Sequence, residues 1–200
     1  GGKTARNYIY GLPYMENKSI SLFEELKNRL GMDGVYNGDV KLVGDETSST
    51  FGNAVLTKFP VLDSKVVILS EFRPLTLEEI EEDQEIWGKV PRHVLDLTVD
   101  INGQQVHAMS WHGAWTAPPT DTEETLTQAK KIAEYLKSLK DPFILGCDSN
   151  AVIGSRIIET INEVATNLME GSGILQTTHP KIHKIVPRGY LIDFIFVSPH

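Results

Sequence analysis

The chain has 200 residues, 40% of them hydrophobic, which is enough to bury the core of one globular domain spanning residues 1–200. The formal net charge of −8 and the isoelectric point near 5.2 exclude a broad basic surface for non-specific nucleic-acid binding, although a local basic cleft is compatible with them. The single cysteine, Cys147, excludes a disulfide within the chain, and we find no signal-peptide pattern and no membrane-spanning apolar run, so we expect a cytoplasmic protein without a membrane span.

The first half of the chain predicts one helix among several strands. Residues 8–12 form a strand candidate that ends at Pro13. Ser21 and Glu24 form a capping box, leucines then recur on one helical face, and Gly31 ends the predicted helix. Further strands are expected at 35–43, 51–61 and 66–69, with a turn or loop at 45–50.

An acidic segment follows, from Leu75 to Trp87. Thr76 and Glu79 form a second capping box, but consecutive carboxylates dominate the segment and do not converge on one point. We therefore expect a solvated acidic helix or loop there, in preference to a metal site.

The second half alternates hairpin strands with helices. Asn102-Gly103 between the alternating runs 94–99 and 105–111 predicts a β-hairpin. Apolar periodicity predicts helices at 126–139 and 157–168, the second capped by Ser155, and strands at 143–145 and 190–197. Helices that separate strands without strict alternation predict an α+β fold, a layered α/β/α sandwich with mostly antiparallel pairing.

The stretch Phe143-Ile144-Leu145-Gly146-Cys147-Asp148-Ser149-Asn150 ends a predicted buried strand with a carboxylate and an amide. Strand alternation places Asp148 and Asn150 on the same side. Such a pair suits Mg²⁺ or a phosphoryl oxygen. Taken alone, the same pattern also fits an Asx turn after a strand.

Four patterns occur in order along the chain: Gly52-Asn53-Ala54-Val55-Leu56-Thr57-Lys58-Phe59-Pro60, Ser110-Trp111-His112, Gly146-Cys147-Asp148-Ser149-Asn150 and Leu191-Ile192-Asp193-Phe194-Ile195-Phe196-Val197-Ser198. Together they resemble the motifs of the endonuclease/exonuclease/phosphatase superfamily, which has the DNase I-like fold. The resemblance extends from about Tyr8 to Ser198. It implies a metal-dependent hydrolase of phosphodiester or phosphate-ester bonds.

The resemblance also implies roles for individual residues. Asp148 would activate or orient the attacking water, and His112 would donate to a phosphoryl oxygen. Asp193 would support the site from a neighbouring strand by orienting a histidine. Asn150 would hold the phosphate, and Asn53 is a further candidate for phosphate binding.

Each role has a structural alternative. His112 could be a core or surface histidine beside Trp111 and Trp115, and Asp193 a buried carboxylate that accepts from turn N–H groups. Cys147 is expected to be a small buried hydrophobic residue, because no neighbouring histidine would activate it as a nucleophile.

The chain also departs from the superfamily pattern. Pro13 and Tyr14 stand where a metal-binding Gln-Glu pair is expected, which leaves Glu16 as the nearest candidate metal ligand. Ser110 replaces the first residue of Asn-Thr-His, and His200 follows the preceding strand too closely to be the closing catalytic histidine.

Two main functions follow. The first is a Mg²⁺- or Mn²⁺-dependent nuclease or phosphatase acting on nucleic acid or on a small phosphorylated substrate, with the loop from Lys181 to Arg188 as either an anion-binding patch or an ordinary solvated loop. The alternative is a catalytically silent domain of the same fold that binds a protein or ligand, or a fragment of a larger enzyme.

Overall fold

The computed structural model describes residues 21–43, 48–70, 75–76, 79, 82, 90–116, 118–179 and 189–199. Its helices are α1 (Leu22–Leu30), α3 (Glu123–Ser138) and α4 (Arg156–Asn162). Its strands are β1 (Asp33–Val43), β2 (Ser48–Thr57), β3 (Val61–Ile68), β4 (Leu75–Thr76), β5 (His93–Ile101), β6 (Gln104–His112), β7 (Phe143–Asp148), β8 (Thr166–Asn167) and β9 (Asp193–Val197).

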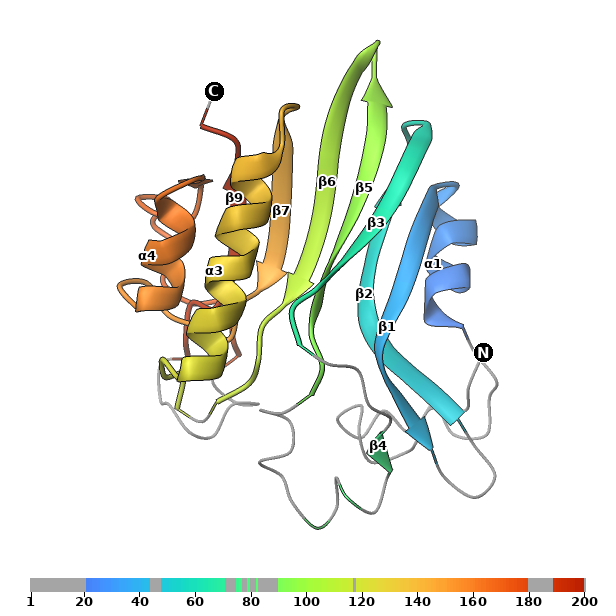
Figure 1. Ribbon diagram of the computed structural model, residues 1–200. Helices are drawn as coiled ribbons and strands as arrows, with labels where there is room; N and C mark the ends of the chain where they lie inside the picture. Colours follow the sequence, from blue (N-terminus) through green and yellow to red (C-terminus); the bar gives the residue numbers. More distant parts are fainter. Residues whose placement is uncertain are drawn as a thin grey trace.

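The strands form two sheets that lie between helices (Figure 1). The smaller sheet has the strand order β2-β1-β4, and the larger has the order β3-β5-β6-β7-β9-β8. Helix α1 flanks the smaller sheet, whereas α3 and α4 cover the larger one from the opposite side. Neighbouring strands are antiparallel except in the pairs β1–β4 and β6–β7. The predicted layered α+β sandwich with mostly antiparallel pairing is therefore confirmed, with two sheets in its central layer.

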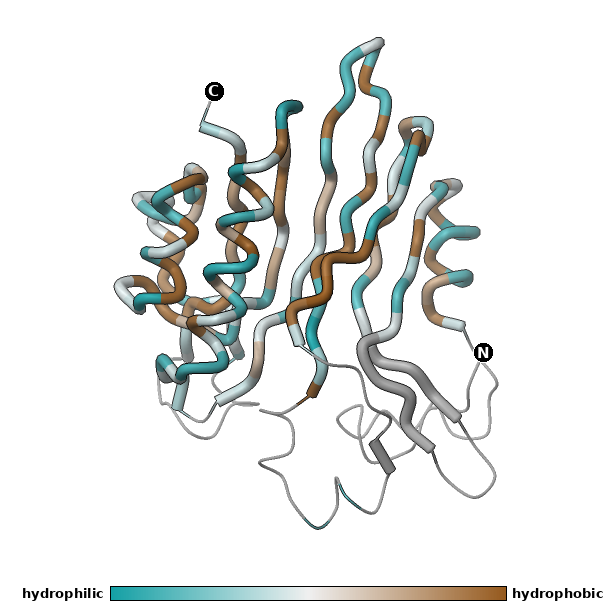
Figure 2. The backbone as a smooth tube through the Cα atoms, viewed as in Figure 1, coloured by the Kyte–Doolittle hydropathy of each residue, from teal (hydrophilic) through white to brown (hydrophobic). Residues whose placement is uncertain are grey.

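Two groups of buried side chains hold these layers together. One group packs the larger sheet against α3 and α4 and includes Leu145, Phe196, Ile132 and Ile158. The other group lies between the sheets, around Leu95, Leu97 and Val99 of β5. Figure 2 shows hydrophobic residues along these strands and along the helices that cover them. Strand β5 is buried on both faces because it contributes to both groups.

The predicted N-cap at Ser21 and the predicted end of the helix at Gly31 are confirmed. The hydroxyl of Ser21 accepts from the backbone N–H of Glu24, and Gly31 ends the helix with φ at 59°. The three leucines predicted for its apolar face remain between 41% and 57% exposed, so the described residues bury little of that face. Capping stabilises the two ends of α1. The contact between the Phe23 and Tyr36 rings packs α1 against β1 of the smaller sheet.

The Asn-Gly hairpin is confirmed as well. Asn102 and Gly103 have φ of 56° and 88°, and they join β5 directly to β6. Both central residues of a type I′ turn need positive φ, which Asn and Gly adopt at low cost.

The structure shortens the predicted helix at 157–168. Helix α4 begins after Ser155 as predicted, but it ends at Asn162, and Thr166 and Asn167 pair with β9 as β8. The apolar period continues past the helix because Val164 and Ala165 pack into the same core from a non-helical segment. The predicted strand at 8–12 and most of the acidic segment lie outside the described residues.

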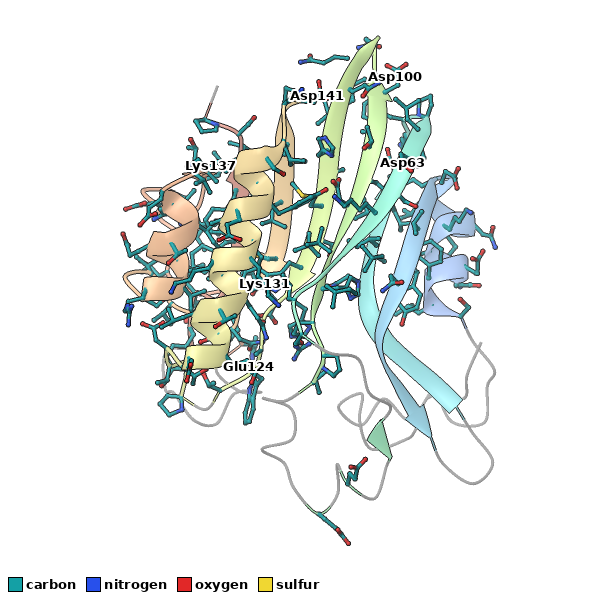
Figure 3. The ribbon with its side chains drawn as sticks, viewed as in Figure 1. Asp63, Asp100, Glu124, Lys131, Lys137 and Asp141 are labelled. Atoms are coloured by element: carbon teal, nitrogen blue, oxygen red, sulfur yellow. The ribbon has the colours of Figure 1, made fainter. Side chains whose placement is uncertain are left out.

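Helix α3 carries complementary charges at its two ends. Figure 3 shows Glu124 near its start and Lys137 near its end, which suits the helix dipole. Thr122 and Thr125 form a reciprocal capping box at its start. None of the described helices has the length and apolar composition needed to cross a membrane.

A buried carboxylate connects α3 to the larger sheet. Asp96 on β5 is 2% exposed, and its Oδ2 lies 2.8 Å from Nδ1 of His107 and accepts a 2.6 Å hydrogen bond from the Tyr135 hydroxyl. Burial and the Asp96 carboxylate together raise the pKa of Tyr135, which therefore remains a donor. Two neighbours thus satisfy Oδ2 of the buried Asp96 carboxylate, whereas its Oδ1 has no hydrogen-bond partner among the described residues.

We predict that Tyr135→Phe lowers the free energy of unfolding by about 1–3 kcal/mol, because a buried carboxylate loses one of its two donors. Urea unfolding monitored by circular dichroism would measure the change. In an Asp96→Asn background the same substitution should cost clearly less, since the acceptor is no longer charged. An equal cost in both backgrounds would contradict a role for this hydrogen bond.

Candidate functional site

Three predicted site residues form one row at the ends of three neighbouring strands of the larger sheet. His112 is the last residue of β6, Asp148 is the last residue of β7, and Asp193 is the first residue of β9. Strand register pairs His112 with Asp148 and Asp148 with Asp193. Directly paired residues point to the same face of a sheet, so the three side chains are neighbours at the lower ends of β6 and β7 in Figure 1.

Backbone contacts hold this row in place. The Gly113 N–H donates to the Asp148 carbonyl at 2.7 Å, and a Cβ at position 113 would lie only 2.2 Å from the Ser149 carbonyl oxygen. Only glycine allows this close approach of the two strand ends. Ser149 donates through both its N–H and its hydroxyl to the Ile192 carbonyl, which ties β7 to the residue before Asp193.

The row lies along a cavity of about 400 Å³. Asn53 reaches the same cavity from β2 of the smaller sheet, so both sheets contribute to it. The other lining residues are Ser110, Trp111, Gly146, Cys147, Phe194 and Ile195. The structure thus brings together His112, Asp148, Asp193 and Asn53, four of the residues singled out from sequence.

Asn150 lies beside this cavity but does not line it. Strand β7 ends at Asp148, and Asn150 has a φ of 50°, so strand alternation does not extend to it. Its side-chain amide donates to the Gly113 carbonyl at 3.0 Å, and its backbone N–H donates to Oδ1 of Asp148 at 3.1 Å. Strand alternation therefore does not decide the side on which Asn150 lies, and its local geometry is the Asx turn considered as the alternative.

The surroundings of Asp148 raise the pKa of its carboxyl group. Burial, followed by the nearby Asp193 carboxylate, raises its pKa to about 6, while the Asn150 N–H and Arg92 oppose the rise. A carboxylate with a pKa near 6 is ionised at neutral pH and is more basic than an exposed aspartate.

His112 is a neutral imidazole throughout the physiological range. Burial, followed by the positive charge of Arg92, lowers its pKa to about 3. Its Nε2 lies 3.8 Å from Oδ2 of Asp148, so the two groups are close, but they do not form an ion pair at neutral pH. His112 can therefore act as a hydrogen-bond donor or acceptor without bringing charge.

Arg92 is a site residue that sequence reasoning missed. It directly precedes β5, is 2% exposed, and its charge lowers the pKa values of both His112 and Asp148. The guanidinium is permanently charged, and its field reaches both groups although Arg92 is not among the residues that line the cavity. In the sequence Arg92 is one arginine immediately before an apolar strand, and this pattern is too common to indicate a functional residue.

His93 and Asn37 were also missed. Asn53 donates from Nδ2 to the His93 carbonyl at 3.1 Å, and the side-chain nitrogens of Asn37 and Asn53 lie 3.3 Å and 3.5 Å from Nε2 of His93. These contacts cross between the two sheets, so no local sequence pattern could indicate them.

The remaining candidates divide into buried and undescribed residues. Cys147 is 9% exposed, and burial raises the pKa of its thiol, so it packs as a small hydrophobic residue, as expected. Trp111 is 2% exposed and belongs to the core beside α3 and α4. Glu16, predicted as a metal ligand, and the basic loop from Lys181 to Arg188 lie outside the described residues.

The fold of this chain has two sheets packed between helices, with polar side chains at one end of the strands. Solved structures that share this fold include the following three. An endonuclease/exonuclease/phosphatase from Bacteroides vulgatus is 20% identical with a TM-score of 0.64, and the match covers 88% of this chain and 69% of that protein. A mannosyl-6-phosphatase from Bacteroides thetaiotaomicron is 17% identical with a TM-score of 0.61, covering 88% and 66%.

The third structure is D. rerio TDP2 in complex with a single-strand DNA product, 15% identical with a TM-score of 0.60, covering 88% of this chain and 66% of that protein. No protein-family model and no curated protein matches the chain. The chain thus has the DNase I-like fold of the endonuclease/exonuclease/phosphatase superfamily, and it spans about two thirds of the length of these structures.

Proposed function

We propose that the chain hydrolyses phosphate esters or phosphodiesters with the help of a divalent cation. The observation that carries this proposal is the row of His112, Asp148 and Asp193, which lines one cavity at the end of three adjacent strands. Phosphoester hydrolysis requires a group that orients and deprotonates water, and donors for the charge on the phosphoryl oxygens. This row and the neighbouring Arg92 offer both.

Asp148 is the proposed base. In an in-line displacement, the water oxygen forms a bond to phosphorus on the side opposite the departing ester oxygen, whose bond to phosphorus breaks. The Asp148 carboxylate takes the proton from that water. Its pKa of about 6 leaves it ionised at neutral pH, so it can accept a proton or hold a cation, and a bound cation would lower that pKa.

We assign phosphate recognition to His112 and Arg92. The neutral His112 donates one N–H to a phosphoryl oxygen, and the Arg92 charge attracts the phosphate. Asn150 and Asn53 were the residues predicted for this role. Their side-chain nitrogens donate to the carbonyls of Gly113 and His93, so we give neither residue the main part in phosphate binding.

The described residues fit a Mg²⁺ or Mn²⁺ ion. Asp148 and Asp193 are paired carboxylates on one cavity wall, and they are the residues that would hold it. No three His, Cys, Asp or Glu side chains converge elsewhere in the described part of the chain, but Mg²⁺ is commonly bound by one or two carboxylates together with water and substrate phosphate. When bound, the cation would neutralise charge on the phosphoryl oxygens.

The substrate class remains broad: nucleic acid or a small phosphorylated molecule. A neighbour of this fold is a mannosyl-6-phosphatase, and another holds a single-strand DNA product. The net charge of −8 makes a small phosphorylated molecule at least as good a candidate as nucleic acid.

The test is hydrolysis of bis-p-nitrophenyl phosphate and p-nitrophenyl phosphate with and without Mg²⁺ or Mn²⁺, followed by mannose 6-phosphate and single-stranded DNA. We expect metal-dependent turnover of at least one aryl phosphate. If no metal at millimolar concentration produces turnover above that of an Asp148→Ala variant, the proposal is wrong.

A silent domain of the same fold is the second candidate. The observation that favours it is that only two carboxylates, Asp148 and Asp193, line the cavity among the described residues. A silent domain that has kept the cavity for ligand binding should still bind an anion such as inorganic phosphate. Phosphate binding by NMR titration, combined with no hydrolysis, would support this second function.

A further inference from the structure

A buried polar array connects the two sheets beside the cavity. Asn37 and Asn53 lie directly opposite each other in the register of β1 and β2, so their side chains share a face. Both side-chain nitrogens approach Nε2 of His93, at 3.3 Å and 3.5 Å. Asn53 also donates to the His93 carbonyl at 3.1 Å. His93 is 2% exposed and Asn53 is 5% exposed.

This array fixes the orientation of the Asn53 carboxamide. Two N–H donors facing Nε2 of His93 make that nitrogen an acceptor, which places the ring N–H on Nδ1. The two hydrogens of the Asn53 side-chain nitrogen are directed at the His93 carbonyl and ring. Asn53 lines the cavity, and the polar side-chain atom that these two contacts leave over is its carbonyl oxygen.

Two carboxylates line the same cavity as Asn53. Asp148 and Asp193 are paired there, and the charge of Asp193 raises the pKa of Asp148, as expected for two neighbouring carboxylates. Asn53 lines the same cavity as these two carboxylates, and its amide oxygen together with them would offer a phosphate oxygen only acceptors. The same three groups are the hard oxygen ligands that Mg²⁺ and Mn²⁺ take.

We propose that Asn53 presents its carbonyl oxygen as a third ligand to a divalent cation held against Asp148 and Asp193, and that His93 and Asn37 are positioning residues that turn its amide nitrogen away from the cavity. This inference rests on the proposed function for the identity of the site. It replaces the phosphate-binding role of Asn53 with a cation-binding one.

The test measures Mn²⁺ binding without any turnover, by water-proton relaxation and by isothermal titration calorimetry. Asn53→Ala should weaken Mn²⁺ binding by about 10–100-fold, and the similarly sized Asn53→Leu should do the same. Asn28→Ala, the same change on the exposed face of α1, is the matched control and should leave the affinity unchanged.

The positioning role has a separate readout. The ring nitrogens of His93 in ¹⁵N NMR spectra should show a protonated Nδ1 and an unprotonated Nε2. Asn37→Ala, which removes one donor to that ring, should weaken Mn²⁺ binding by less than Asn53→Ala does. A His93 ring protonated on Nε2 would overturn the proposed orientation.

The outcomes also separate this inference from the proposed function. If Asn53→Ala and Asn53→Leu both bind Mn²⁺ as tightly as the wild type, or if the wild type binds none, the cation role of Asn53 is wrong, whether or not hydrolysis is observed. If Mn²⁺ binding depends on Asn53 but no phosphoester is hydrolysed, the inference stands and the proposed function fails.

Discussion

Asp148→Asn should lower metal-dependent phosphodiester hydrolysis by about 10²–10⁴-fold, the usual contribution of a positioned general base. The substitution keeps the size of the side chain but removes its ability to accept a proton from water. His112→Ala should cost a comparable 10²–10³-fold, because it removes a donor to the developing charge. Initial rates with bis-p-nitrophenyl phosphate at fixed Mn²⁺ concentration would measure both.

A stability measurement distinguishes loss of chemistry from loss of fold. Asp148 is disfavoured as a carboxylate by burial and by Asp193, so a neutral asparagine should leave the unfolding midpoint at pH 8 unchanged or raise it. An inactive variant that is also strongly destabilised would point to misfolding. A fully active Asp148→Asn variant would remove Asp148 from the mechanism.

The second prediction is that Asp148 and His112 change stability with pH in opposite directions. The folded pKa of His112 is about 3, against 6.5 in the unfolded chain. Between these values only the unfolded state takes up the proton, so stability falls as the pH decreases from 6.5 toward 3, by a few kcal/mol in total. The folded pKa of Asp148 is about 6, against 3.8 unfolded, so stability rises as the pH decreases from 6 toward 3.8.

A variant that lacks one of the two groups should therefore show the pH dependence of stability that the other group contributes. With Asp148→Asn, stability should fall more steeply than in the wild type as the pH decreases from 6.5 to 4. With His112→Asn, it should fall less than in the wild type, or rise. Urea midpoints at pH 7, 6, 5 and 4, measured in EDTA, provide the test, and parallel curves for all three proteins would contradict it.

Local signals in the sequence predicted the elements well. The Ser21 cap, the Asn102-Gly103 turn and the Ser155 cap each depend on neighbouring residues, so each could be identified without knowledge of the fold. The ordered motifs also placed His112 and Asp148 at strand ends, and the sheet register then aligned both with Asp193.

Features that depend on distant pairing could not be predicted. His93 acts on Asn53 from another sheet, and Arg92 influences the cavity from the residue before β5. The exposed leucines of α1 show the same limit, because periodicity predicts an apolar face but not how much of it the described residues cover. The side of Asn150 could not be predicted from strand alternation, because the strand ends at Asp148 and Asn150 has a left-handed conformation.

The parallel pairing of β6 and β7 has a consequence for how the protein folds. Antiparallel neighbours can form by closing a short turn, as β5 and β6 do, but parallel neighbours must wait for the intervening segment that contains α3. His112 and Asp148 thus meet only after that long loop has closed, and Asp193 arrives from still farther along the chain. The row that we propose for catalysis is therefore expected to be completed late in folding, so that a chain with a formed β5–β6 hairpin has no assembled site.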